Sequence, residues 1–254
     1  MKRILLSIIA LMHVLCGMAA AETDAFAEAN RRFGAGDFAG AAAIYENILA
    51  EQGPRASVYY NLGNAYQQAK NYGPAILAYE RARLLTPRDP DLLANLALAR
   101  KAAAAFEETG RDPRLEAALG FLSRNEWSWL VAGAALFFGA LTAVSGAIGL
   151  RNRGFRKAAF VSAGVAVVVI IAGSVVLWMR RDEEQRGVVL TERAALHLSP
   201  FEKAETLGTP GPGRIVRILE RNGGFLYVAV PGTNLRGWLA DNEVAAITTS
   251  APGR

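Results

Sequence analysis

The stretch Ala41-Ala42-Ala43-Ile44-Tyr45-Glu46 returns at an offset of 34 as Ala75-Ile76-Leu77-Ala78-Tyr79-Glu80. In both stretches an alanine and a tyrosine lie four residues apart, which places them on one face of a helix. The same offset relates Asn61-Leu62 to Asn95-Leu96. A period of this length predicts stacked helix pairs, because a single pair cannot bury its apolar face alone.

The clearer copy of this pattern, repeat two, spans residues 56–89. Its first helix should carry one apolar face made of Tyr59, Leu62, Gly63 and Tyr66. We expect Gly63 to allow close approach of the neighbouring helix, and Pro87 to end the second helix. The pattern closely resembles tetratricopeptide repeats. That resemblance implies a surface for binding proteins and not an active site.

Repeat one is less regular. Phe33 and Phe38 are five residues apart, whereas Tyr66 and Tyr72 are six residues apart. Matching these aromatic residues predicts that the turn in repeat one is one residue shorter, so that the first helices would correspond at an offset of 33.

A third helix should follow Pro90 and run toward Phe106. No partner helix is expected after it, because Gly110-Arg111-Asp112-Pro113 breaks the pattern. We therefore assign residues 22–108 to the repeat domain and 109–126 to a linker. An array of two and a half repeats is short, so we expect it to be supported by a partner or a membrane.

The first helix of repeat two should have inward-facing positions at Ser57, Tyr60, Asn64, Gln67 and Gln68, with Asn61 and Asn95 just beside that face. The candidate protein-binding residues are Tyr60, Asn61, Asn64, Gln67, Gln68 and Asn95. Amide side chains both donate and accept hydrogen bonds, which suits them to the backbone of an extended peptide. The same residues could equally be ordinary solvated or inter-helix polar groups.

Residues 1–21 have the three parts of a signal peptide. Lys2 and Arg3 precede an apolar run, and small residues lead to an expected cleavage after Ala21. Two alternatives remain open. The segment could stay uncleaved as an anchor helix, or Cys16 could carry a lipid.

Two further runs, 127–150 and 158–179, contain no charged residue and are long enough to span a bilayer. Between them, residues 151–157 hold four arginines and lysines and no acid. The positive-inside rule makes this loop cytoplasmic and both flanking domains extracytoplasmic. The expected location is a plasma membrane, which the family resemblances described below make a bacterial inner (plasma) membrane.

A stripe of small residues runs along the first span, at Ala135, Gly139, Ala143 and Ala147. Small residues at this spacing allow helices to pack closely in a membrane. The stripe could pack against the second span, or against another membrane protein.

Residues 187–247 change to short β-type runs separated by turns such as Arg221-Asn222-Gly223-Gly224. The runs around Leu196-His197-Leu198, Ile215 to Leu219 and Gly237-Trp238-Leu239 resemble bacterial SH3 (SH3b) domains. That resemblance implies a small all-β barrel and a possible contact with peptidoglycan. Residues 248–254 look like a loose tail.

The order of segments gives a multidomain membrane protein with tetratricopeptide repeats, a two-helix transmembrane hairpin and an SH3-like barrel. This order, with Ala29-Asn30-Arg31-Arg32-Phe33 and Asn95 to Arg100, resembles BatE-type proteins of bacterial aerotolerance operons. The resemblance implies von Willebrand A-domain membrane proteins and a MoxR-type ATPase as neighbours, with a role in envelope stress. It implies no catalytic residue.

Reactive side chains are scarce. Cys16 is the single cysteine, and His13 and His197 are the two histidines. Without the first 21 residues only His197 remains, so we expect no metal site, no cofactor and no catalytic centre. Four of the positive charges lie in the short loop between the apolar runs, which argues against nucleic acid as a partner. An adaptor is thus the leading hypothesis, a cell-wall-binding module the second, and a wall hydrolase using His197 the third.

Overall fold

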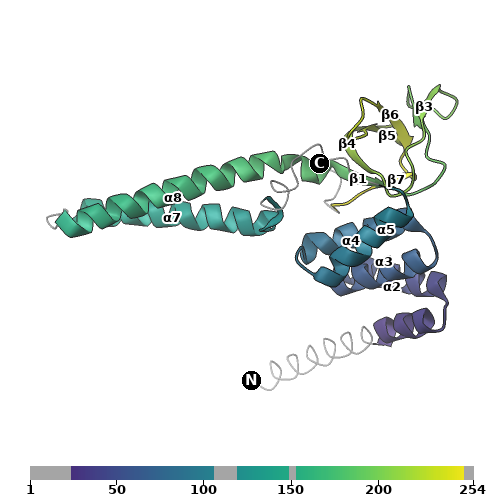
Figure 1. Cartoon of the computed structure of the whole chain (residues 1–254), viewed down its shortest axis with the longest axis horizontal. Coiled ribbons are helices and arrows are strands. Elements are labelled where there is room, and N and C mark those ends of the chain that lie inside the picture. Colours follow the sequence, from purple (N-terminus) through teal and green to yellow (C-terminus); the bar gives the residue numbers. More distant parts are fainter. Residues whose placement is uncertain (1–23, 106–118, 149–152, 249–254) are drawn as a thin grey trace, which may run out of the picture. The chain divides into compact units, whose positions relative to one another are not determined.

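The computed structural model describes residues 24–105, 119–148 and 153–248 (Figure 1). The expected signal peptide, the sequence break at 110–113 and nearly all of the tail lie outside these ranges. The chain divides into two compact units. Residues up to Thr109 and from Gln185 onward together make the first, which we call the repeat–sheet unit, and Gly110–Glu184 make the second, which we call the hairpin unit.

The repeat helices come first in the repeat–sheet unit. They are a helix over residues 24–34, α2 (Phe38–Gln52), α3 (Ala56–Gln68), α4 (Tyr72–Leu85) and α5 (Pro90–Ala102). Asp37 caps α2 by accepting a hydrogen bond from the Gly40 amide at 2.9 Å. Asp89 caps α5 in the same way, and Pro90 begins that helix where its missing amide costs nothing. The predicted helical repeats are thereby confirmed.

The backbone repeats at a constant offset of 34, with no shorter turn. Two residues after each first helix of the three repeats comes a residue with positive φ, at Gly36 (83°), Lys70 (59°) and Ala104 (52°). The next amide always returns to a carbonyl five residues back, at 2.8–2.9 Å. The prediction of a shorter turn in repeat one was therefore wrong. It matched aromatic residues by type, whereas the turn shows that Phe33 corresponds to Gln67.

We expect Lys70→Gly to raise the free energy of unfolding by about 1 kcal/mol, because glycine adopts this left-handed conformation without steric cost. Gly36 already provides glycine at the equivalent place. Urea titration of the detergent-solubilised full chain would measure the change. Ala69→Gly is the matched control: Ala69 has φ of −74°, so glycine there should not stabilise. Equal effects of the two substitutions would contradict this account.

The core of the repeats is built from alanines and tyrosines. Tyr45, Ile76 and Tyr79 are fully buried. A Cβ on Gly63 would lie 2.5 Å from Cε1 of Tyr79, so a side chain at this position cannot fit beside the ring. The predicted role of Gly63 in close helix packing is confirmed.

The C-terminal part of this unit is one antiparallel sheet. Its strands are β1 (Arg186–Val189), β2 (Leu196–His197), β3 (Thr206–Gly208), β4 (Ile215–Asn222), β5 (Phe225–Ala229), β6 (Arg236–Ala240) and β7 (Val244–Ala246). The strand order is β3-β2-β6-β5-β4-β1-β7. The predicted turn at Gly223 and Gly224 joins β4 to β5, with both glycines at positive φ as a two-residue hairpin requires.

The sheet is not closed, so the expected barrel is corrected to an open sheet. Within residues 186–248, β3 and β7 form the two edges and are not paired with each other. Each has only three residues, and β2 contacts β6 through the single pair His197–Trp238. The two edges therefore offer at most three residues each for further pairing.

The sheet packs directly against the repeat helices. Val188, Ile215 and Ile247 join the same apolar core as the helices. Arg81 Nη2 on α4 donates to the Ala246 carbonyl at 2.9 Å, and a Cβ on Gly73 would lie 2.3 Å from the Leu190 carbonyl oxygen. The repeats and the sheet, expected as separate domains, are therefore parts of one compact unit.

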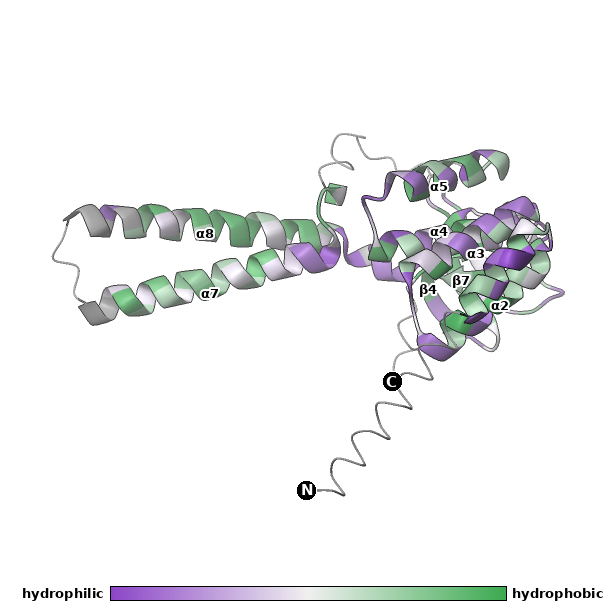
Figure 2. Cartoon of the chain, turned by 90° about the horizontal axis from the view of Figure 1, so that it is seen from below, coloured by the Kyte–Doolittle hydropathy of each residue, from purple (hydrophilic) through white to green (hydrophobic). Residues whose placement is uncertain are grey.

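The hairpin unit contains α7 (Arg124–Ile148), α8 (Arg153–Met179) and the short 3₁₀ helix η1 (Arg181–Gln185), whose last residue belongs to the repeat–sheet unit. Figure 2 shows that α7 and α8 are mostly apolar along their length. By length and composition, two helical stretches of the described residues could cross a membrane, Arg124–Ser145 and Ala159–Gln185. Helix α8 begins at Arg153, inside the segment expected to be a loop.

Contacts between α7 and α8 do not use the three residues of the predicted small-residue stripe whose side chains the structure describes. Ala135, Gly139 and Ala143 are exposed, and nothing lies within 4 Å of a Cβ placed on Gly139. The close approach comes from α8, where a Cβ on Gly173 would lie 2.4 Å from Cγ2 of Val131. For these three residues, the expected packing of the stripe against the second span was therefore wrong.

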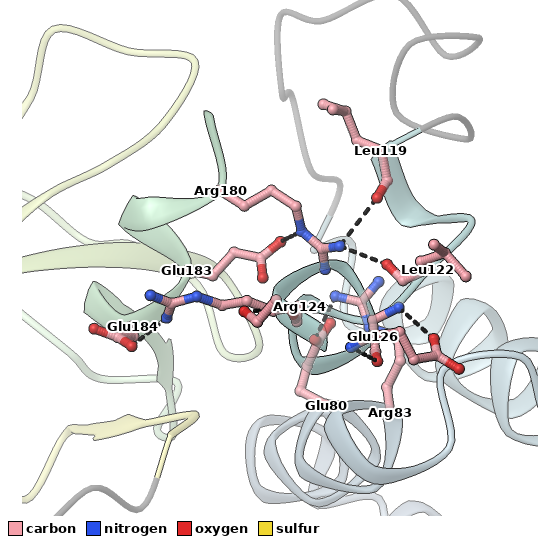
Figure 3. A network of polar contacts seen from close by, with 11 residues as sticks. Glu80, Arg83, Leu119, Leu122, Arg124, Glu126, Arg180, Glu183 and Glu184 are labelled. Carbon is pink, nitrogen blue, oxygen red and sulfur yellow. Dashed lines mark hydrogen bonds and ion pairs between the residues drawn. The ribbon is translucent and has the colours of Figure 1, made fainter. Parts of the chain in front are cut away.

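Polar contacts fasten the open end of this hairpin (Figure 3). Arg180 donates to the carbonyls of Leu119 and Leu122, at 3.0 and 2.7 Å, and pairs with Glu183 at 2.7 Å. Arg124 forms an ion pair with Glu184. These contacts connect the start of α7 with the end of α8.

Candidate protein-binding surface

A network of hydrogen bonds joins α3, α4 and α5. Asn95 Nδ2 donates to the Tyr60 hydroxyl at 2.9 Å and to Asn64 Oδ1 at 3.0 Å. The Tyr79 hydroxyl lies 2.7 Å from Asn64 Oδ1 and 2.9 Å from Gln67 Oε1. The structure thus brings together four of the six predicted binding residues, through a tyrosine that the prediction did not include.

The other two predicted residues are outside this network. Asn61 is half-buried and Gln68 is exposed. In the described part of the chain neither side chain shares a hydrogen bond with the four residues above. The protein-binding role of all six residues stays a prediction.

The network determines which groups remain available to a ligand. Because Asn64 Oδ1 accepts from two neighbours, its amide nitrogen keeps both N–H groups for other acceptors. The Tyr60 hydroxyl accepts from Asn95, so its own proton can be donated outward. The half-buried surface therefore offers mainly donors, which fit the carbonyl groups of an extended peptide.

The same arrangement occurs one repeat earlier, where sequence reasoning missed it. The Tyr45 hydroxyl donates to Asn30 Oδ1 at 2.6 Å, which corresponds to the Tyr79–Asn64 contact at an offset of 34. Phe26 packs edge-on against Tyr45 with ring centroids 5.8 Å apart. The signal was present in the sequence, since both asparagines and both tyrosines share this offset.

Burial controls the protonation of the network tyrosine. It raises the pKa of Tyr79 above its ordinary range, and the nearby Tyr60 adds to the shift. The hydroxyl therefore keeps its single proton at neutral pH, and the oxygens of Asn64 and Gln67 share it. This fixes the orientation of the Asn64 amide.

A second polar cluster surrounds Glu80, whose side chain is only 1% exposed. Arg83 Nη2 lies 2.7 Å from its carboxylate, and Arg100 of α5 forms a second ion pair. Glu80 and Arg83 are among the residues drawn in Figure 3. Burial alone would raise the pKa of Glu80. The charges of Arg83, Arg186 and Arg100 outweigh it and lower the pKa to about 2. This cluster connects α4, α5 and β1, so its role is structural.

Other reactive groups do not gather into a site. His197 Nδ1 lies 3.1 Å from the Ala204 carbonyl oxygen. Across the described ranges, no group of three or more His, Cys, Asp or Glu side chains is placed to hold a metal ion. The expectation that the chain is not an enzyme and uses no cofactor stays a prediction.

One face of the sheet carries aromatic side chains. Leu226 and Leu239 point into the sheet's own core, whereas Tyr227 and Trp238 alternate with them on the opposite face. The two rings lie 5.1 Å apart and are half-buried. Trp238 is therefore a surface residue of the sheet and not a core residue.

A comparison with protein families identifies the type of the helical repeats. The model of the tetratricopeptide repeat family matches residues 32–100. These residues form tetratricopeptide repeats. The match runs from the end of the first helix into α5, and so includes every residue of the polar network. A search of curated proteins found no match.

Proposed function

We propose that the chain is a non-enzymatic, membrane-anchored adaptor that binds envelope proteins through its tetratricopeptide repeats. The observation that carries the proposal is the half-buried network of Tyr60, Asn64 and Asn95, in which the Tyr60 hydroxyl and the Asn64 oxygen both accept from Asn95. Tetratricopeptide repeats generally mediate binding between proteins. Peptide carbonyls are the acceptors that this surface fits best.

The surface of the hairpin unit supports membrane anchoring. Leu136, Phe137 and Val168 are 76%, 53% and 64% exposed, and similar residues follow along both helices. Such continuous apolar surface is unfavourable in water and favourable in lipid. The absence of charge inside residues 127–150 and 158–179 agrees with this interpretation.

The repeat–sheet unit supports the proposed topology. Because α4 packs against β1, the residues before and after the hairpin must lie on the same side of a membrane. Two crossings satisfy this requirement. The positive charges of residues 151–157 then favour a cytoplasmic loop and an extracytoplasmic repeat–sheet unit.

The cellular setting rests on resemblance. The likeness to BatE-type proteins favours von Willebrand A-domain membrane proteins as partners, and a role in oxygen tolerance or envelope stress. The SH3b likeness of residues 187–247 is compatible with an open antiparallel sheet of short strands.

In-membrane crosslinking tests the adaptor. Photoreactive residues at Asn64 and Gln68 should capture one dominant partner, whereas the exposed Asn47 on α2 should not. Asn95→Ala removes the internal donor that orients the Tyr60 hydroxyl and the Asn64 amide, and should therefore lower the yield at Gln68 about fivefold, the loss of roughly one hydrogen bond to the partner. Equal yields at Asn47, or capture of further copies of this chain alone, would contradict the proposal.

A second candidate function is contact with peptidoglycan through the sheet. The Tyr227–Trp238 pair favours it, because aromatic faces can stack on sugar rings. If this is correct, the full chain in detergent should sediment with purified sacculi, and Trp238→Ala should reduce the retained fraction at least fivefold, about 1 kcal/mol. Phe201→Ala, at another exposed aromatic residue, serves as the control. Retention that survives Trp238→Ala would exclude this face.

A further inference from the structure

The third repeat leaves a helix face uncovered. In repeat two, Tyr79 of α4 contacts α3 at Tyr60, Gly63, Asn64 and Gln67. An offset of 34 leads from these four positions to Ala94, Ala97, Leu98 and Lys101 of α5, all of which are exposed. Leu93, which corresponds to the 5% exposed Tyr59, is 40% exposed. We call these five residues of α5 the third-repeat seat.

The seat has the backbone of a complete repeat up to the turn. Ala104 has a left-handed φ like those of Gly36 and Lys70. The next residue, Ala105, is buried and is the equivalent of Asn71, which comes directly before α4. The sequence that follows is nevertheless unsuited to a second helix. At the places of Ala75, Ile76, Tyr79 and Ala82 it has Thr109, Gly110, Pro113 and Glu116. A proline removes a helical hydrogen bond, and a glutamate would bury a charge.

The seat also differs from α3 in a way that selects its occupant. Ala97 replaces Gly63, and a Cβ at that place meets the ring of a tyrosine seated like Tyr79. Leu98 and Lys101 replace the two amides that accept from the Tyr79 hydroxyl, and neither can accept a hydrogen bond. An aliphatic side chain fits this place, whereas a tyrosine would clash and leave its hydroxyl unsatisfied.

We propose that the third-repeat seat binds an amphipathic helix of a partner protein, antiparallel to α5, with an aliphatic residue where α4 carries Tyr79. The helix would have the length of α2 and α4, which are 15 and 14 residues long. Binding at the seat completes the third repeat. It is a surface beyond the polar network of the proposed function.

Two probe peptides test this preference. Both have the sequence of residues 72–85, and one of them carries Tyr79→Leu. Fluorescence anisotropy with the full chain in detergent should show saturable binding of the leucine peptide, and at least tenfold weaker binding of the tyrosine peptide. In the chain itself, Ala97→Gly should strengthen binding of the tyrosine peptide only in part, because its hydroxyl still lacks an acceptor at Leu98 and Lys101.

Substitutions at the seat complete the test. Leu93→Asp and Leu98→Asp should each weaken the leucine peptide at least tenfold, while Leu207→Asp, at an exposed leucine of β3, should not. Asn64→Ala should leave binding of the leucine peptide unchanged, while it should lower binding of the partner at the polar network of the proposed function. The two proposals can therefore fail independently. Equal affinity for the two peptides, no saturable binding, or a full chain that dimerises through Leu93 would overturn the proposal.

Discussion

Replacing Glu80 with alanine is expected to lower the free energy of unfolding of the repeat–sheet unit by about 3–5 kcal/mol. The substitution leaves the positive charges of Arg83 and Arg100 close together, with side chains only 30% and 20% exposed. Removing one member of a buried ion pair is costly because the remaining charge loses its close partner without becoming fully hydrated. Pulse proteolysis of the detergent-solubilised full chain across a urea gradient would measure the loss.

The chain offers a matched control for this experiment. Glu46 occupies the place of Glu80 one repeat earlier, is exposed, and accepts a hydrogen bond from the neutral Tyr66. Glu46→Ala should cost about 1 kcal/mol, the typical value of one hydrogen bond. If the two substitutions had the same effect, burial and charge at Glu80 would not matter.

The same carboxylate predicts a pH dependence. Its pKa in the folded chain is lowered to about 2, below the unfolded value. The associated stability is therefore fully present above about pH 4.5 and is lost as the pH falls toward 2. A difference of roughly two pKa units corresponds to about 3 kcal/mol. Glu80→Gln should flatten this part of the stability–pH curve.

Gly73→Ala is expected to destabilise the contact between the repeats and the sheet by about 2–3 kcal/mol. The new Cβ would lie 2.3 Å from the carbonyl oxygen of Leu190, and backbone atoms cannot rotate away as a side chain can. The sheet must shift from α4 to accommodate it. Hydrogen exchange should therefore accelerate in β1 and β7 while α3 stays protected.

Ala39 provides the comparison for Gly73. It occupies the equivalent place at the start of α2. Ala39→Gly should cost at most about 1 kcal/mol, through helix propensity alone. If Gly73→Ala left hydrogen exchange in β1 unchanged, the contact between the sheet and α4 described above would be contradicted.

The helical part of the fold could be predicted because its signals are local. Alanine and tyrosine at a fixed period identify the helices, and a glycine among them, Gly63, indicates close packing. The register of repeat one could not be predicted by matching aromatic residues, because the residue equivalent to Phe33 in repeat two is Gln67, which is not aromatic. The register is set by the backbone turns after the first helices. Two of these turns have Lys70 and Ala104 at the position with positive φ, where glycine would have been the recognisable signal.

The joining of repeats and sheet was beyond sequence reasoning because its contacts are distant along the chain. Arg81 and Ala246 are 165 residues apart. Gly73 looks like an ordinary helix residue, and only the nearby Leu190 carbonyl explains it. Four of the six predicted binding residues meet in one network, and the contact of Tyr79 with Asn64 was missed although the offset of 34 that it shares with Tyr45 and Asn30 is visible in the sequence.

The hairpin unit separates the two parts of the repeat–sheet unit along the chain, and this has a consequence for biosynthesis. The ribosome releases the helices first and the strands last, so α4 must wait for β1 until residues 110–184 have been made. If those residues enter a membrane, the strands reach α4 only when both apolar helices have crossed. The repeat–sheet unit would then fold completely only in correctly inserted chains. Chains with a single crossing would expose Val188 and Ile215 to proteases and chaperones.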